Sequence, residues 1–550
     1  MNAIFTSVNG LVNNEFVTRI ITESYLQESS FNPAWYPQGI QSSFKTAMKA
    51  GLLQLERRGQ ALFVSVDEAK LASLMGCSTF SLREIRRQIL VAKYSLATEP
   101  SETSPVMVKS NHALMESGIY RAGFARVSHM GYRYDRAMLA LHRNAIEDSI
   151  IADIDVPDGH KTLDYQEIIH EVVDNMLDFT GEYFSSDGYA DQRGRFYFTK
   201  GAFTPQNNKL ARSLMQLPQP VALTANGRDA VAMFISELAG VKASSAQDRL
   251  VLGYDLLDSK AIPDGLHLWE QIWLQRIYEN WSDQSNWLVP IELDATASAV
   301  QFLSVLLNDH ALMEQVNLIY DGILHDFWAS TDLPREHMKR YLTPHIYGSQ
   351  ASARDLWMKN HLQVTPELLA IAKRVENLPH VRGIFLLKNH ILENMAMPQP
   401  EMNVNIGTES FTVHCTRFVP SRRVEFVRVY KPINDKIGVD IPIRVPNLKE
   451  PDLESFKRFF PSCLIHNLDS QVANQICRRL DWVIPNHDAW IISPNDGLKL
   501  RLWYVSLLHR KVYAQRHSIL ARYLASIGCK GKINDVSRGE VQRFSVACLK

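Results

Sequence analysis

The sequence contains few cysteines and no closely spaced pair of them. Its 550 residues include six cysteines, none within a C-x-x-C pattern. Zinc ribbons depend on such pairs and disulfide frameworks on many regularly spaced cysteines, so the sequence argues against both and favours a reducing compartment. The six are Cys77, Cys415, Cys463, Cys477, Cys529 and Cys548.

Long apolar runs are also lacking. No stretch approaches the roughly 18 uninterrupted apolar residues of a transmembrane helix, so we expect no membrane as a partner. Residues 1–16 lack the basic start and apolar run of a signal peptide, and the arginine-rich pattern of a transit peptide. We find no internal repeat and no low-complexity segment, and expect two to four packed units.

An excess of one charge sign is absent from the whole chain but present locally. Basic and acidic side chains number 59 each, so a nucleic-acid site must arise from local asymmetry. Residues 497–550 hold eleven basic against two acidic side chains, a net charge of +9, whereas residues 144–188 carry −11. The basic segment is a candidate phosphate-tracking surface, and a solvated helix face is the alternative.

The N-terminal part of the sequence predicts mainly helices. Residues 1–160 are expected to be mostly helical, with a candidate helix-turn-helix from Asp67 to Leu90 whose second helix carries Arg83, Arg86 and Arg87. An apolar period of 3.6 residues predicts a further helix over 164–184. A D-x-x-G-R turn at Asp191 to Arg195 then leads into a short strand, Phe196 to Phe198.

The remainder of the chain alternates between helical and strand patterns. Helices are expected from Pro205 to a compact apolar strand at 287–295, and again over 311–400. Residues 403–447 alternate between apolar and polar and predict β-hairpins. A second buried strand is expected over 481–492, before a basic helical tail.

Each of the two apolar strands is associated with an aspartate, Asp294 in the first and Asp488 in the second. An unpaired buried carboxylate is costly, and a divalent cation held by oxygen ligands is a common compensation. Carboxylates on adjacent strands can hold two Mg²⁺ ions, an arrangement that assists in-line phosphoryl transfer. Capping of a turn is the ordinary alternative for such aspartates.

A basic helix is predicted between the two aspartates. Asp332 is a suitable N-cap and Pro334 suits the first turn. Arg335 and Lys339 are four residues apart and share one helix face, where they can bind a triphosphate. Tyr347-Gly348 follows at the helix end, where the ring can stack on a base. A solvated basic face is again the alternative.

The order of these motifs resembles the bacteriophage-type, single-subunit DNA-dependent RNA polymerase family, which shares its catalytic core with mitochondrial RNA polymerases. The resemblance covers about residues 165–510. It depends on D-x-x-G-R, the Asp294 segment, R-x-x-x-K-x-x-x-x-x-x-x-Y-G and His487-Asp488, in that order. Smaller matches lie at Phe203–Gln206, Ser298–Gln301, Lys431–Ile433 and Pro461–His466.

The resemblance implies a right-hand fold of palm, fingers and thumb, in the α+β class and predominantly helical. It implies a helical N-terminal region and thumb over 1–165, and the first part of the palm over 166–310. The fingers would be residues 311–402, a β-rich insertion 403–460, and the second part of the palm with the basic tail 461–550.

The resemblance also assigns roles to residues. Asp294 and Asp488 would hold two Mg²⁺ ions, while Arg335 and Lys339 would bind the incoming ribonucleoside triphosphate. Tyr347, with Gly348, would close over the nascent base pair, and His466 would approach the sugar. The hybrid of DNA template and RNA product would contact Asp191, Gly194 and Arg195. The role of His487 is left open.

Three positions favour RNA over DNA as the product. A-type DNA polymerases resemble this pattern but carry a glutamate five residues after the first metal aspartate, where it blocks a 2′-hydroxyl. This chain has Ala299 there, and Ala489 after the second aspartate. The third position is Tyr347, whose hydroxyl can join His466 in hydrogen-bonding a 2′-hydroxyl. A site built for a hydroxyl rejects the analogue that lacks it.

Several alternatives remain beside this interpretation. An A-type DNA polymerase or a primase-like enzyme shares the fingers motif. His170-Glu171-Val-Val-Asp174 is nearly the H-E-x-x-H motif of zinc hydrolases. A non-catalytic nucleic-acid-binding protein is an alternative from another class. Pro344 departs from the family pattern and is expected to kink the basic helix.

The resemblance also leads to expectations about how RNA synthesis starts and about where in the cell the protein acts. The stretch from Lys431 to Ile465 is interrupted by Pro442, Pro446, Pro451 and Pro461. This predicts short pieces rather than the long hairpin that reads promoters in larger relatives. We therefore expect starts on single-stranded or pre-melted DNA, or help from a template-delivering or single-stranded-DNA-binding protein. The expected location is the cytoplasm of an infected bacterium.

Overall fold

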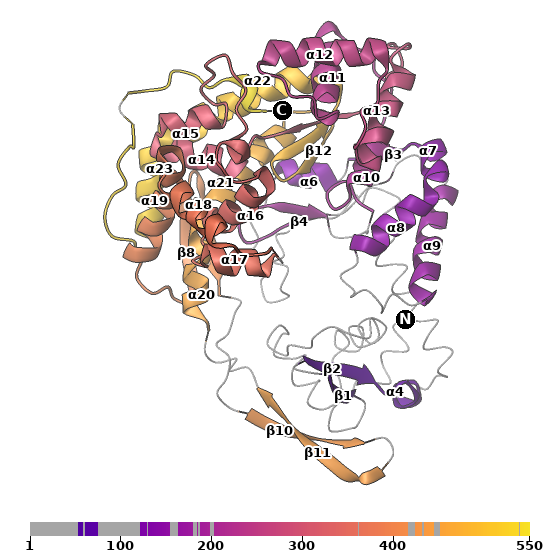
Figure 1. The fold of residues 1–550 in the computed structure, drawn as a ribbon, viewed down its shortest axis with the longest axis vertical. Helices are drawn as coiled ribbons and strands as arrows, with labels where there is room; N and C mark the ends of the chain where they lie inside the picture. Colours follow the sequence, from indigo (N-terminus) through magenta and orange to yellow (C-terminus); the bar gives the residue numbers. More distant parts are fainter. Residues whose placement is uncertain are drawn as a thin grey trace.

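The fold is described by a computed structural model, shown in Figure 1. The structure describes residues 53–58, 61–74, 122–128, 130–153, 163–179, 184, 188–198, 203–360, 362–415, 424–431, 434–444, 451–537 and 539–549. Helices dominate these residues, and the strands form small sheets.

A three-stranded antiparallel sheet lies at the centre, in the order β12-β13-β7 (β12, Val483–Asn486; β13, Ala489–Ile492; β7, Ile291–Asp294). All four residues of β13 are buried, as its apolar sequence requires. The prediction of one strand over 481–492 is wrong, because the chain reverses at His487-Asp488 and forms a hairpin. The first strand begins at Ile291 rather than Trp287.

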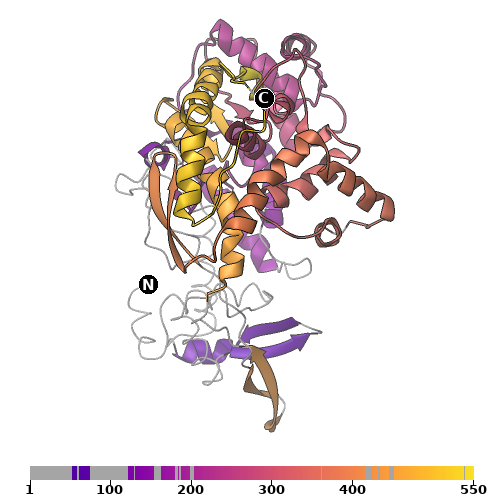
Figure 2. The ribbon, with the colours of Figure 1, turned by 90° about the vertical axis from the view of Figure 1, so that its left-hand side faces the viewer.

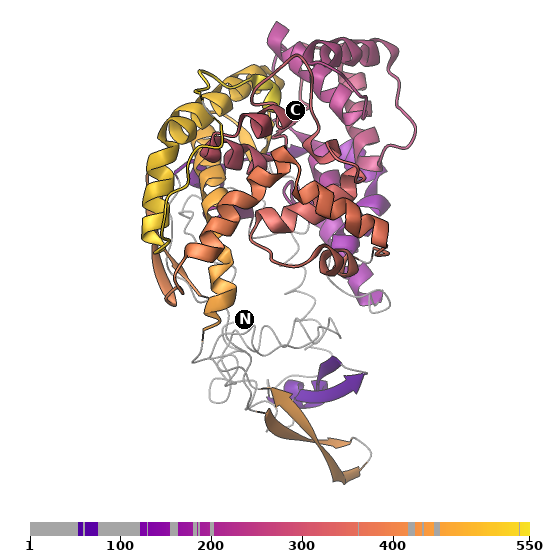
Figure 3. The ribbon, with the colours of Figure 1, turned by 60° about the vertical axis from the view of Figure 1, so that its left-hand side comes forward.

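Helices cover this sheet on several sides. α11 packs against β7, and α21 packs against β12. Every residue of α14 is buried, and this helix contacts α19, α21 and α23. Figure 3 shows α16 to α19 in front, between the yellow C-terminal helices and the magenta helices α11 to α13. The bounds are α11 (Ala225–Leu238), α12 (Ala246–Ser259), α13 (Leu268–Asn280), α14 (Ser298–Leu307), α21 (Phe459–Cys477), α22 (Gly497–Leu507) and α23 (Arg516–Ser526).

The helical prediction for 311–400 is confirmed over most of this range but is wrong over 316–334, which contains no α-helix. The helices there are α15 (His310–Gln315), α16 (Arg335–Ile346), α17 (Ala353–Lys359), α18 (Pro366–Glu376) and α19 (Pro379–Asn394), with a 3-10 turn at Phe327–Ala329. α20 (Leu453–Lys457) lies later in the chain. α16 begins at Arg335 with Pro334 as its N-cap, so the prediction of Asp332 as the cap is wrong. Asp332 instead pairs with Arg374 at 3.1 Å.

The N-terminal part is less helical than predicted. Strands β1 (Leu53–Arg58) and β2 (Ala61–Val66) form an antiparallel hairpin where helix was expected. Of the candidate helix-turn-helix, only α4 (Glu68–Leu74) is described, while its turn and second helix lie outside the described residues. Next come α6 (Ala122–Ser128), β3 (Arg133–Tyr134), α7 (Arg136–Leu141), α8 (Arg143–Asp153), α9 (Leu163–Asp178), β4 (Gly188–Ala190), β5 (Phe196–Phe198), α10 (Lys209–Leu214) and β6 (Met215–Gln216).

The hairpins predicted over 403–447 are present. β8 (Glu401–Ile406) pairs with β9 (Glu409–His414), and β10 (Val424–Lys431) pairs with β11 (Asn434–Arg444). Figure 2 shows the β8–β9 hairpin alongside α23. The expectation that prolines break this region into short pieces is wrong, because β11 continues through Pro442, which pairs with Phe426. Either strand of a two-stranded ribbon is an edge, where a proline is tolerated.

None of the helices in the described residues combines the length and the apolar content that crossing a bilayer requires.

Candidate active site

The two strand-end aspartates lie side by side. In the register of β13 and β7, Ala489 is opposite Asp294, and the Ala295 N–H donates to the Asp488 carbonyl at 3.1 Å. The Ser298 hydroxyl donates to the Asp488 carboxylate at 2.7 Å. Both aspartates line a cavity of about 680 Å³. The sheet thus presents two carboxylates to the same cavity.

Unusual backbone conformations place these carboxylates. His487, in the two-residue connection between β12 and β13, has a φ of 58°, and Ala297, before α14, has a φ of 56°. Positive φ is uncommon for residues other than glycine and persists only where the surroundings enforce it. Two such residues lie close to the aspartates in the sequence. The surrounding structure therefore enforces a strained backbone at this end of the sheet.

α16 contributes cations to the same cavity. Arg335 and Lys339 both line it, as their spacing of four residues predicted. The Arg335 Nε donates to the Asp326 carboxylate at 2.8 Å, and Lys339 is exposed. Within the described residues no carboxylate pairs with Lys339. α16 therefore offers one anchored and one available positive charge.

Tyr347 caps the C-terminal end of α16 and also lines the cavity. Its ring centroid lies 4.4 Å from that of His466 on α21. Burial raises the pKa of Tyr347 to about 12, so its hydroxyl stays protonated at neutral pH. Burial lowers the pKa of His466 well below its ordinary value, with the nearby Arg195 charge as the next cause. The pair is thus a protonated phenol against a neutral imidazole.

The corner after Tyr347 requires glycine. Gly348 has a φ of 94°, and a Cβ there would lie 2.5 Å from the Arg458 carbonyl oxygen. α16 runs continuously through Pro344 to Ile346, so the proline does not end the helix before Tyr347.

The D-x-x-G-R turn connects β4 and β5 and docks on α21. The Asp191 carboxylate accepts from the N–H groups of Arg193 and Arg195, both at 3.0 Å, and Gly194 has a φ of 86°. Arg195 pairs with the buried Asp469 at 2.9 Å. Burial disfavours the charged form of Arg195, but the neighbouring Asp469, Tyr347 and Asp488 outweigh it and raise its pKa.

The predicted residues therefore fall into two groups. Asp294, Asp488, Arg335, Lys339 and Tyr347 line the cavity. The others lie next to this group rather than among the lining residues. They are His466, Gly348, Asp191, Gly194 and Arg195.

Sequence reasoning missed a second set of charged residues in the cavity wall. Lys242 lies between α11 and α12, and Arg249 lies on α12, where it pairs with Glu237 at 3.0 Å. His325 and Trp328 also line the cavity. No local motif identifies these residues. The Ser245-x-x-Asp248 cap predicts the start of α12, but not which cavity the helix faces.

The H-E-x-x-D segment forms an ion cluster between α8 and α9. His170 Nδ1 lies 2.9 Å from the Glu147 carboxylate, and Arg143 pairs with Asp174 at 2.7 Å and with Glu147 at 3.0 Å. Among the described residues, no group of three or more His, Cys, Asp or Glu side chains is arranged to hold a metal. Ion pairing accounts for the segment without a zinc ion.

Comparison with known proteins gives one partial similarity. No protein-family model matches the chain. A stretch of 167 residues is 28% identical to a protein named "Probable DNA-directed RNA polymerase" from Neurospora crassa. The match covers 29% of this chain and 18% of that relative, so the chain spans less than a fifth of the relative's length. Part of the chain is thus similar to a protein named as an RNA polymerase.

Proposed function

We propose that this chain copies a DNA template into RNA in the manner of the bacteriophage-type enzymes. It would add ribonucleoside triphosphates to an RNA 3′ end and release pyrophosphate. The observation that carries the proposal is the single cavity in which two sheet-end carboxylates meet Arg335, Lys339 and Tyr347. The partial similarity to an RNA polymerase supports the same reaction class.

The carboxylate pair suits Mg²⁺. Mg²⁺ is usually held by one or two carboxylates together with water and substrate phosphates rather than by a full protein cage. Asp294 and Asp488 provide two such groups on paired strands, and the adjoining Ser298 hydroxyl orients Asp488. When bound, two Mg²⁺ ions would stabilise charge on the attacking and leaving oxygens. The residues present fit this ion.

The cationic walls suit a triphosphate. Arg335 can bind phosphate oxygens through two donors, and Lys339 can act as a point charge. Lys242 and Arg249 add positive charge from α12 and the segment before it. Positive charges that are already in place before the reaction stabilise the negative charge that develops on the departing pyrophosphate.

The sugar side of the cavity suits a ribose. Ala299 lines the cavity five residues after Asp294, and its methyl group leaves the space that a glutamate would fill. The Tyr347 ring and the neutral His466 ring lie together, and each side chain carries a polar group that can exchange a hydrogen bond with a 2′-hydroxyl. These groups favour ribonucleotides over deoxyribonucleotides.

The remaining assignments follow the proposed right hand. Residues 166–310 and 461–550 would form the palm, 311–402 the fingers, and 1–165 the N-terminal region and thumb. The D-x-x-G-R turn would contact the template–product hybrid through Arg195. Initiation on single-stranded or pre-melted DNA stays a prediction, because the β10–β11 hairpin removes the argument that this region is broken into short pieces.

Incorporation of labelled ribonucleotides on a single-stranded DNA template tests the proposal. We expect Mg²⁺-dependent RNA synthesis by the unaltered chain. In Asp294→Asn and Asp488→Asn the activation free energy should rise by several kcal/mol, so that the rate falls more than about a hundredfold. Template binding should persist in both. Asp481→Asn is the matched control, because this aspartate lies seven residues before Asp488 with a fully exposed side chain.

Two results would refute the proposal. Near-normal synthesis by either active-site variant would remove the carboxylates from the mechanism. Template binding without any synthesis by the unaltered chain would favour a nucleic-acid-binding protein.

A further inference from the structure

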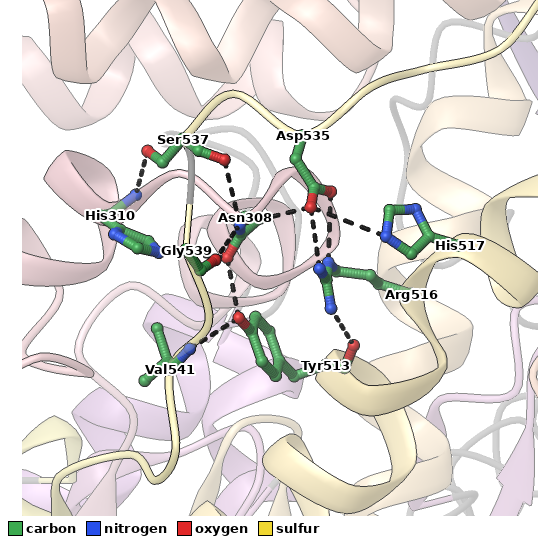
Figure 4. A network of polar contacts seen from close by, with 9 residues as sticks. All are labelled: Asn308, His310, Tyr513, Arg516, His517, Asp535, Ser537, Gly539 and Val541. Atoms are coloured by element: carbon green, nitrogen blue, oxygen red, sulfur yellow. Dashed lines mark hydrogen bonds and ion pairs between the residues drawn. The ribbon is translucent and has the colours of Figure 1, made fainter.

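Residues 530–537 and 539–549 form a strap that contacts α14 at its C-terminal end, where Asn308 holds it, and the loop before that helix. The Asn308 amide donates to the Asp535 carboxylate at 3.3 Å and to the carbonyls of Ser537 and Gly539 at 3.2 and 3.0 Å. Asn308 is fully buried and has a φ of 50°. Figure 4 shows this side chain surrounded by the strap.

Two further residues, Tyr513 and Arg516, take part in the contacts that hold the strap at Asn308. We call this group of contacts the Asn308 clasp. The Tyr513 hydroxyl donates to the Asn308 amide oxygen at 3.0 Å and accepts from the Val541 N–H at 2.8 Å. Arg516 pairs with Asp535 at 2.8 Å (Figure 4). Each polar group of the Asn308 side chain is therefore used in holding the strap.

The other end of the strap reaches the loop that follows Asp294. The Cys548 carbonyl accepts from the Thr296 N–H, the Thr296 hydroxyl and the Gln301 amide, each at 3.0 Å. Leu549 forms an isolated β-bridge with Ala295, and Ala547 lines the cavity. Gln301 is fully buried and Thr296 is half-buried. Both side chains also donate to the Val316 carbonyl, so the Thr296 N–H is the donor that depends on the strap alone.

We infer that the strap is a positioning element of the active site, with Asn308 as the residue that fastens it. Between Asp294 and α14 the chain passes through Ala297, whose positive φ persists only while the surroundings enforce it. Release of the strap would leave the Thr296 N–H without its acceptor and would break the bridge between Ala295 and Leu549. An unsatisfied backbone donor is costly, which favours rearrangement of the loop. The loop would then carry Asp294 out of its register with Asp488.

This inference rests on the proposed function only for its effect on catalysis. The release of the strap can be measured without any activity. Burial raises the pKa of the Cys548 thiol to about 12, and its side chain is fully buried, so it should resist thiol reagents while the strap is fastened. Cys463 and Cys477 are equally buried but lie on α21, away from the strap, and report global unfolding.

Asn308→Asp is the primary test. Aspartate keeps the size of asparagine and tolerates positive φ, but it replaces the donating amide with a carboxylate facing Asp535 and two carbonyls. We expect labelling of Cys548, followed by peptide mass spectrometry, to accelerate by at least about tenfold, with Cys463 and Cys477 unchanged. Val536→Ala, on the exposed side of the strap, is the control and should label as the unaltered chain does.

Steady-state kinetics tests the positioning role. In Asn308→Asp we expect kcat to fall by at least about tenfold, because small displacements of a catalytic group are costly. The nucleotide KM should stay within about twofold, because the triphosphate-binding cations lie on other elements. A purely structural role would leave kcat per folded molecule unchanged.

Defined outcomes overturn the inference. Unchanged Cys548 labelling would show that Asn308 does not fasten the strap, and faster labelling with unchanged kcat would show that the strap does not position the site. If all buried cysteines label faster, Asp535→Asn decides, because it removes the charge without altering the shape and should give the same selective pattern more weakly. If the unaltered chain makes no RNA, the proposed function fails while the labelling result still stands.

Discussion

His487 combines a left-handed backbone with a neutral side chain. Burial lowers its pKa to about 4, with the charge of Arg195 as the next cause. Its ring packs against Tyr197 at a centroid distance of 4.9 Å. The residue therefore packs in the site as an uncharged ring at neutral pH, while its turn places Asp488.

The depressed pKa of His487 makes stability depend on pH. The unfolded chain takes up a proton near pH 6.5 and the folded chain only near 4, so the unfolded state binds more protons in this window and the free energy of unfolding falls as pH decreases from 6.5 to 4. Each pKa unit of difference is worth about 1.4 kcal/mol.

His487→Asn should flatten this dependence, because asparagine tolerates positive φ and does not titrate. Urea denaturation at pH 7 and pH 5 measures the difference. An equal loss of stability in the variant and the unaltered chain would show that His487 does not contribute. His466 titrates in the same direction and is expected to maintain part of the slope.

Lys339 is expected to carry much of the triphosphate affinity. Lys339→Ala should lower kcat/KM for nucleotides by more than about a hundredfold, because the lost charge acts within a partly enclosed cavity. Arg340→Ala is the matched control, since Arg340 is the next residue on α16, is exposed and is absent from the cavity lining. Similar kinetics for the two variants would show that Lys339 does not bind the triphosphate and that α16 presents an ordinary solvated basic face.

Tyr347 is expected to select the sugar. Tyr347→Phe should retain synthesis but reduce the preference for ribonucleotides a few-fold, since one neutral hydrogen bond is worth about 0.5–1.5 kcal/mol. The ratio of kcat/KM for the two nucleotide classes measures this preference. An unchanged ratio would show that the hydroxyl is not the selector.

At the scale of elements, the Tyr347-Gly348 corner joins α16 to the segment leading into α17. Gly348→Ala should be more destabilising than Gly322→Ala. Both glycines have a φ near 100°, but a Cβ at Gly322 meets open space, whereas at Gly348 it meets the Arg458 carbonyl at 2.5 Å. The difference between the two variants isolates the steric clash from backbone strain, which costs about 1–2 kcal/mol in both.

The difference in melting temperature between these two variants measures the clash. Equal melting temperatures would mean that the segment around Arg458 moves away from the added Cβ with no loss of stability. Because the corner presents Tyr347 to the cavity, we also expect Gly348→Ala to reduce nucleotide incorporation more than Gly322→Ala does.

Local pattern predicted the elements where the periodicity was long and unbroken. The spacing of Arg335 and Lys339 placed both on one side of α16, and the alternation over 403–447 predicted both hairpins. The hairpin at His487-Asp488 was missed because its turn lacks the glycine or asparagine that usually signals one. Pro442 led to the wrong prediction of short pieces, because a proline in an edge strand does not end that strand.

At the scale of the molecule, charge counted along the sequence did not predict charge on the surface. The basic segment 497–550 uses some of its cations internally. Arg501 is buried and donates to the carbonyls of Val546 and Leu549, and Arg516 is buried against Asp535. Which cations face solvent depends on tertiary packing, and the net charge of +9 gives no information about that packing.

Long-range assembly explains what else the sequence could not show. The cavity joins residues from Glu237 to Ala547, and the strap contacts a loop about 250 residues away in the chain. Motif order identified Asp294 and Asp488 as partners through resemblance to a family. It gave no indication of Lys242, Arg249 or the Asn308 clasp, because these meet the site only in the folded chain.

Templated RNA synthesis can be tested directly by sequencing the product. The purified chain would be given a single-stranded DNA oligonucleotide of defined sequence, Mg²⁺ and all four ribonucleoside triphosphates, and the product would be sequenced and treated with alkali. We expect alkali-labile RNA complementary to the template, absent with Asp488→Asn. Products that do not follow the template, or alkali-stable products made only from deoxyribonucleotides, would contradict it.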